Sequence, residues 1–116
     1  MIQVFGTAKC KDTQKAIRFF KERTVKIQFI DLSQKAVSKG ELDSILLTVK
    51  LDDLLNKNSK EYERLNLQYM VHDVREQLLE HPLLLTTPIV RFKTKAVVGL
   101  KPEVWNEWAT ESKKKQ

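Results

Sequence analysis

The fold of this chain is decided near its start by residues 2–13, which read IQVFGTAKCKDT. The first four of these residues alternate with the period of two that is typical of a β-strand, and Gly6 ends the alternation. A short loop then carries Cys10 to a helix, because apolar residues follow helical spacing from Asp12 or Thr13 onward. The stretch therefore predicts a strand that turns at once into a helix, with a cysteine at the junction.

The remainder of the chain predicts a second half that completes a sheet. Residues 25–32 alternate again, and a strand that follows a strand and a helix so closely is expected to be parallel to the first. Residues 35–82 predict an all-helical insert, which Pro82 ends because proline cannot continue a helix. The other expected elements are helices at 38–46, 51–56, 59–65 and 71–80, a hairpin of strands at 89–92 and 96–98, and a last helix from Pro102.

This order of elements, βαβ, insert and ββα, predicts an α/β protein with a mixed four-stranded sheet of the thioredoxin-like kind. One domain over residues 1–116 is expected, since 116 residues with 41% apolar composition suit a single core. No apolar run approaches the roughly 20 residues that cross a bilayer, and the first residues lack a signal pattern. A single cysteine cannot form an internal disulfide. We expect a cytoplasmic monomer without membrane attachment.

The charge of the chain points to a solvated surface. A net charge of +6 would suit acidic partners or nucleic acid. Most basic residues are mixed with acidic ones along helical faces, as in residues 57–64, and three of the 21 lie in the terminal run 113–115. Aromatic residues do not alternate with a basic stripe, as base stacking would require, so nucleic-acid binding is not expected.

Cys10 is the candidate nucleophile. A thiol between a strand and the first turn of a helix meets the positive end of the helix dipole and unpaired N–H groups, which favour the thiolate. Lys9 and Lys11 add positive potential, and the Thr13 hydroxyl can approach the sulfur from one turn along the helix. A buried structural cysteine is the alternative, but flanking lysines do not suit burial.

The motif around Cys10 lacks the second cysteine of a dithiol pair, because residues 10–13 read CKDT. A mixed disulfide or sulfenic acid on Cys10 would need an outside thiol such as glutathione, glutaredoxin or thioredoxin. No bound cofactor is expected. No metal site is expected either, because His72 and His81 have no companion ligands.

Several single residues carry smaller expectations. Pro88 precedes an apolar strand, either as an ordinary edge residue or as a cis proline whose neighbour Thr87 would pair with an extended substrate opposite Cys10. Asp12 is expected to cap the first helix, and His81 to lie at a helix C-terminus. Two tryptophans in the last helix, Trp105 and Trp108, are expected in the core.

Taken together, these features resemble the ArsC/Spx family of thioredoxin-like proteins. The residues that carry the resemblance are 5–16 (FGTAKCKDTQKA), 54–58 (LLNKN) and 80–90 (EHPLLLTTPIV). The resemblance implies a thiol oxidoreductase of the arsenate reductase family, with Cys10 and Thr13 as catalytic residues. The alternative that it implies is an Spx-like regulator without catalysis, which binds RNA polymerase.

The resemblance also implies where oxyanion-binding arginines belong. Family members that reduce arsenate hold it with arginines, and this chain has Thr87, Asp52 and, at best, Lys101 at those places. Replacing guanidinium groups in this way removes bidentate donors, and Asp52 would repel an oxyanion. Arsenate reduction is therefore expected only if Arg91, Lys101 or the lysines beside Cys10 substitute for them. The complete set of expected substrate-binding residues is Lys9, Lys11, Thr87, Pro88, Arg91 and Lys101.

Overall fold

The computed structural model describes residues 1–67 and 73–114. Its sheet has four strands in the order β2-β1-β3-β4. The central strand β1 (Ile2–Gly6) is parallel to β2 (Ile27–Asp31) and antiparallel to β3 (Ile89–Phe92), and β4 (Lys95–Val98) forms the far edge. The mixed sheet of a thioredoxin-like fold with a helical insert between its halves is thereby confirmed.

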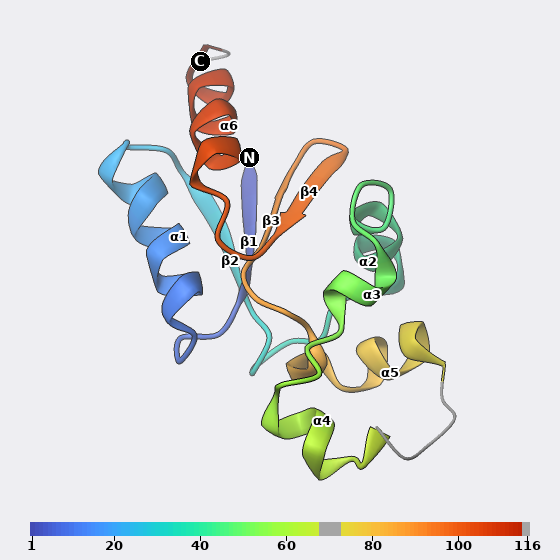
Figure 1. Cartoon of the computed structure of the whole chain (residues 1–116). Helices are drawn as coiled ribbons and strands as arrows, with labels where there is room; N and C mark the ends of the chain where they lie inside the picture. Colours follow the sequence, from blue (N-terminus) through green and yellow to red (C-terminus); the bar gives the residue numbers. More distant parts are fainter. Residues whose placement is uncertain (68–72, 115–116) are drawn as a thin grey trace.

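Helices cover both faces of the sheet (Figure 1). Two long helices lie on one face, and the short helices between β2 and β3 lie on the other. Among the described residues, no helix is long and apolar enough to span a membrane. The helices are α1 (Lys11–Glu22), α2 (Lys39–Ile45), α3 (Leu51–Leu54), α4 (Lys60–Arg64), α5 (Val74–Glu80), the 3-10 turn η2 (Pro82–Leu84) and α6 (Pro102–Lys114).

The alternation of β1 divides the core into two parts. Ile2 and Val4 are fully buried against α1 and α6, whereas Phe5 is buried on the side of the insert. Trp105 and Trp108 of α6 are buried in the first of these clusters, so the expectation that they serve the core is confirmed. The sheet is thus covered on both faces, and β1 is one of its two inner strands.

The ends of α1 differ from expectation for identifiable reasons. The helix begins at Lys11 with Cys10 as its N-cap residue, so the prediction that Asp12 caps it is wrong. Because the helix starts earlier, Asp12 occupies its first turn instead. At the other end, Thr24 has a positive φ of 55° and the Val25 N–H donates to the Phe20 carbonyl at 3.0 Å, which closes the helix. Val25 is therefore not free to begin a strand, and β2 starts only at Ile27.

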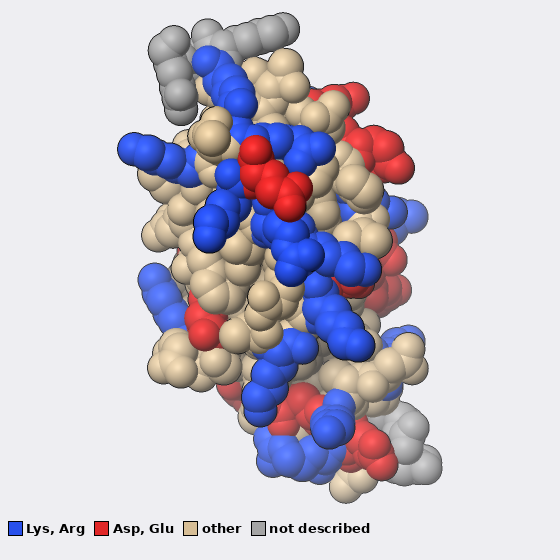
Figure 2. Space-filling view, turned by 90° about the vertical axis from the view of Figure 1, so that its left-hand side faces the viewer, with Lys and Arg blue, Asp and Glu red and all other residues tan. Residues whose placement is uncertain are grey.

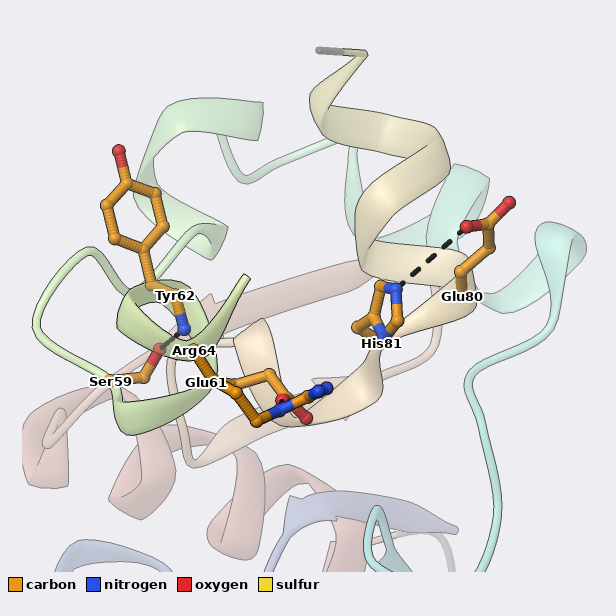
Figure 3. Close-up of polar contacts among 6 residues, drawn as sticks. All are labelled: Ser59, Glu61, Tyr62, Arg64, Glu80 and His81. Carbon is orange, nitrogen blue, oxygen red and sulfur yellow. Dashed lines mark hydrogen bonds and ion pairs between the residues drawn. The ribbon is translucent and has the colours of Figure 1, made fainter. Parts of the chain in front are cut away.

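The insert is helical as predicted, with shorter helices. Ser38 caps α2 through a complete capping box with Glu41. Figure 3 shows Ser59 at the start of α4, where its hydroxyl accepts from the Tyr62 N–H at 3.1 Å. It also shows His81 at the end of α5, as expected, with Glu80 at 4.0 Å. The predicted start of α5 at Val71 and the residue His72 lie outside the described residues.

The hairpin of β3 and β4 has a two-residue turn rather than the three-residue link that the sequence suggested. Lys95 is paired with Phe92 across the hairpin, so it belongs to β4. Lys93 makes the turn with a positive φ of 58°. The sequence offered no glycine or asparagine to mark this position.

The end of β1 approaches α1 so closely that only glycine fits there. A Cβ atom on Gly6 would lie 2.3 Å from Thr13 Oγ1 and 2.5 Å from Thr13 Cγ2. Both residues are buried, and the contact sets the position of the first turn of α1 against the sheet. Gly6 is therefore required for packing, which the sequence interpretation, where it only ended a strand, did not recognise.

We expect Gly6→Ala to lower the free energy of unfolding by about 1–3 kcal/mol, because the added methyl group displaces Thr13. Gly40→Ala is the matched control: nothing lies within 4 Å of its added Cβ, and the residue is in a helix, so stability stays constant or rises by about 0.5 kcal/mol. Urea unfolding of both variants measures the difference. Equal stabilities would contradict the packing role of Gly6.

Candidate active site

The loop after β1 presents Cys10 at the start of α1. The Cys10 N–H donates to the Thr7 carbonyl at 3.2 Å, and the Gln14 N–H donates to the Cys10 carbonyl at 3.1 Å. Cys10 has extended backbone angles, φ −81° and ψ 118°, as an N-cap residue should. Its thiol is half-buried and lies where α1 leaves its first N–H groups without helical partners. The junction predicted from the sequence is thus present.

Thr87, which lies 77 residues further along the sequence, contacts the same sulfur. Its hydroxyl donates a hydrogen bond to Cys10 Sγ at 3.0 Å, and the thiol in turn faces the Thr87 carbonyl at 3.8 Å. The peptide bond between Thr87 and Pro88 is cis, so of the two interpretations of this proline the cis form is confirmed. Pro88 is buried directly before the first residue of β3. Cys10 and Thr87 together form the centre of the candidate site.

The segment around Thr87 is fixed by hydrogen bonds on both sides. The Thr86 N–H donates to the Leu54 carbonyl at 2.7 Å, and the Gly99 N–H donates to the Pro88 carbonyl at 2.8 Å. A bridge between Leu55 and Leu85 extends the first of these contacts. The stretches 54–58 and 80–90, which are far apart in the sequence, are therefore joined. Together with Gly99 they hold Thr87 in place.

The environment of the thiol favours its ionised form. Burial raises the pKa of Cys10, and this is the largest single influence on it. The hydroxyl groups of Thr13 and Thr87 and the backbone N–H groups of Thr13 and Asp12 together outweigh burial and leave the pKa of Cys10 below its ordinary value. The N–H groups are those of the first turn of α1. The expectation of an activated thiol therefore has a geometric basis.

Thr13 is the buried member of this site. Its side chain is fully buried, and its hydroxyl makes no regular hydrogen bond to any described residue. A buried hydroxyl without a partner costs about 1–3 kcal/mol. The hydroxyl nevertheless lies near enough to Cys10 to lower the pKa of the thiol. This hydroxyl has no acceptor while Cys10 is protonated. When Cys10 ionises, its negatively charged sulfur supplies one.

The other predicted residues lie at different distances from this centre. Lys9 and Lys11 flank Cys10 and are both exposed. Arg91 pairs with Gln3 and Ala96 in the sheet, three residues beyond Pro88 or about 10 Å along the strand. Within the described residues no hydrogen bond or ion pair joins its side chain to Cys10, and its role in binding substrate stays a prediction.

Lys101 lines a different pocket, of about 530 Å³, which lies between the insert and β4. Its neighbours there include Thr48, Lys50 and Asp53, and none of the residues around Cys10. Its role in substrate binding also stays a prediction. Within residues 1–67 and 73–114, no three His, Cys, Asp or Glu side chains are grouped as a metal site would require.

We expect Thr87→Ala to raise the pKa of Cys10, because the hydroxyl that stabilises the thiolate is removed. Below the pKa of the variant, alkylation by iodoacetamide should be slower by roughly three- to tenfold, as a loss of about 1 kcal/mol for one hydrogen bond implies. At alkaline pH the two rates should converge, since both thiols are then ionised. Thr110→Ala is the control, because its hydroxyl bonds within α6. Identical pH profiles for all three proteins would refute the role of Thr87.

Comparison with solved structures places the fold among known ones. An arsenate reductase from Vibrio cholerae superposes with a TM-score of 0.76 at 21% identity, covering 92% of this chain and 96% of that one. An ArsC family related protein from Bacteroides fragilis gives a TM-score of 0.77 at 22% identity, covering 92% and 96%. At such identities the likeness establishes the fold alone.

Sequence comparison adds the family. A global transcriptional regulator, Spx 2 of Bacillus anthracis, is 23% identical in an alignment 108 residues long, which covers 89% of this chain and 82% of that protein. The family model described as "ArsC family" matches residues 5–108, which run from the end of β1 through Cys10, the insert and Pro88 into the first half of α6. The chain belongs to the ArsC family.

Proposed function

We propose that this protein is a thiol oxidoreductase in which Cys10 is the only nucleophile and an external thiol completes the cycle. The observation that carries the proposal is the hydrogen bond of 3.0 Å from the Thr87 hydroxyl to Cys10 Sγ. It stabilises the thiolate, which is the reactive form of a cysteine. The buried hydroxyl of Thr13 supports the same state, and both residues act on the sulfur from fixed positions.

The reaction begins with a mixed disulfide formed between a protein thiol and a small thiol such as glutathione. The Cys10 thiolate attacks the sulfur of the small thiol, so a new S–S bond forms on Cys10, the old one breaks, and the protein thiolate leaves and takes a proton from water. A second glutathione thiolate then attacks the same sulfur, which releases the Cys10 thiolate and glutathione disulfide. The low pKa of Cys10 helps this second step, because a stable thiolate is a good leaving group.

Thr87 has a second part in this scheme through its carbonyl. In the neutral protein the carbonyl faces the thiol at 3.8 Å. Ionisation of Cys10 removes that weak donor, so the carbonyl is free to accept an N–H from an extended substrate backbone. Thr86 and Pro88 are held by Leu54 and Gly99, so the carbonyl between them is already in position. This arrangement would orient a peptide disulfide toward Sγ.

Arsenate is a poor substrate for the same site. Thr87 stands where the resemblance implies an arginine, and its hydroxyl is committed to Cys10. Asp52 is exposed at the start of α3 and carries a negative charge, and Lys101 belongs to the other pocket. Without bidentate donors around the sulfur, an oxyanion gains little from binding there.

A regulator without catalysis is the second candidate, and the similarity to Spx 2 of Bacillus anthracis favours it. Such a protein acts by contact with a partner and has no need of a reactive thiol. Reactivity of Cys10 separates the two candidates, because a depressed thiol pKa has no purpose in a binding surface.

The proposal predicts reduction of hydroxyethyl disulfide by glutathione in the presence of this protein, with glutathione reductase and NADPH to recycle the glutathione. We expect a rate well above that of the uncatalysed reaction and complete loss of the excess in Cys10→Ser. Thr87→Ala should lower the rate at neutral pH by roughly three- to tenfold, for the reason given above.

Arsenate in place of the disulfide should give no NADPH consumption above the blank. If the wild-type protein is no faster than Cys10→Ser with the disulfide, the oxidoreductase proposal fails and the regulator remains. Turnover with arsenate would show instead that lysines near Cys10 replace the missing arginines.

A further inference from the structure

The face of α1 that points away from the core is basic from its start to Lys21, and the exposed acidic residue Glu22 follows only at the end of the helix. Lys11, Lys15 and Arg18 fall on one line of the helix, opposite the buried Ala16 and Phe20, and all three are exposed. Lys9 before the helix and Lys21 beside the line are exposed as well. Figure 2 looks on to this side of the molecule and shows a band of basic side chains running down it with few acidic ones among them. We call Lys9, Lys11, Lys15, Arg18 and Lys21 the α1 basic face.

These charges are not explained by the stability of the helix. Cations near a helix N-terminus are unfavourable by about 0.3–1 kcal/mol, and the face begins with lysines at that end. Intramolecular pairing leaves most of it unneutralised: Lys15 lies 3.9 Å from Asp12 with both side chains about half exposed, and within the described chain no ion pair involves Lys9, Lys11, Arg18 or Lys21. A surface of this kind gains most from an external acidic partner.

The α1 basic face begins at the thiol itself. Lys9 and Lys11 are the immediate neighbours of Cys10, and Arg18 lies about 10 Å from Lys11 along the helix axis. That span exceeds a single oxyanion and matches three to four residues of extended polypeptide. Beside the loop lies a pocket of about 240 Å³, which has room for one apolar side chain and includes the half-exposed Leu83. Its lining residues are Thr7, Ala8, Lys9, Ser33 and Leu83.

We propose that the α1 basic face docks an acidic polypeptide segment and thereby brings the mixed disulfide of that segment to Cys10. The inference rests on the proposed thiol chemistry and names the substrate class for it. A nucleic acid fits less well, because Phe19 of the same helix is covered by the Arg23 guanidinium at 3.6 Å, which blocks that face of the ring from base stacking. A nucleic acid also carries no sulfur for Cys10 to attack.

The test uses three synthetic peptides of equal length, each with one cysteine held as a mixed disulfide with thionitrobenzoate. Acidic, neutral or basic residues flank that cysteine. Cys10 attacks the peptide sulfur, a disulfide forms between protein and peptide, and the coloured thionitrobenzoate anion leaves. At low salt we expect the acidic peptide to react roughly tenfold faster than the neutral one, and the basic peptide to react slowest. At about 1 M salt the order should disappear, because charges are screened within about 3 Å.

Arg18→Glu isolates the docking surface from the thiol. The residue lies about 12 Å along the helix from Cys10, and its reversal should slow the acidic peptide by roughly fivefold relative to the neutral one. Iodoacetamide, which is small and uncharged, measures the thiol in each variant, and dividing by its rate removes any change in thiol reactivity. Lys95→Glu makes the same charge reversal at an exposed position on the far edge strand and should leave the preference intact.

The outcomes separate this inference from the proposed function. Equal rates for the three peptides in the wild-type protein would overturn the docking surface and leave the thiol chemistry standing. Two competitors are added to the reaction of the acidic peptide: a cysteine-free acidic peptide and a single-stranded oligonucleotide. If both slow the reaction equally, the proposed docking of a polypeptide is overturned too, since the surface would then bind any polyanion. No reaction with the peptides or with hydroxyethyl disulfide would overturn both.

Discussion

The antiparallel pairing of β1 with β3 is the constraint on which the site depends. Phe5 at the end of β1 is paired with Ile89 at the start of β3. The loop after β1 and the segment before β3 therefore lie at the same end of these two strands. Cys10 follows the one and Thr87 precedes the other, so two residues that are 77 positions apart meet at 3.0 Å. Nothing local to either segment would bring them together.

Other elements fix the positions of Cys10 and Thr87 more closely. Gly6 lets α1 pack so closely on the strand that Thr13 is buried beside the thiol, and the insert reaches back through Leu54 to hold Thr86. The thiol is consequently subject to opposed effects: burial raises its pKa, and the donors of α1 and Thr87 lower it. The donors prevail because they are fixed before the charge forms, which is how a protein stabilises an anion more effectively than water does.

Membership of the ArsC family describes the scaffold more than the chemistry. An arsenate reductase has a similar fold, and a transcriptional regulator has a similar sequence. One scaffold can therefore carry different functions. At the position before the cis proline, where the resemblance implies an arginine, this chain has Thr87, whose hydroxyl donates to Cys10 Sγ. The thiol chemistry proposed for this protein uses this donor and needs no guanidinium group for an oxyanion.

The sequence by itself determined the succession of strands and helices along the chain and the junction at Cys10, because periodicity and helix-start signals are local properties. It placed the start of α1 one or two residues late and assigned Asp12 a cap that Cys10 occupies. Only the tertiary structure decided that Thr87 donates to Cys10, that Gly6 accommodates Thr13, and that Leu54 and Gly99 hold the proline segment. These contacts join residues far apart in the chain, and their geometry follows from sheet register and packing, which no local pattern encodes.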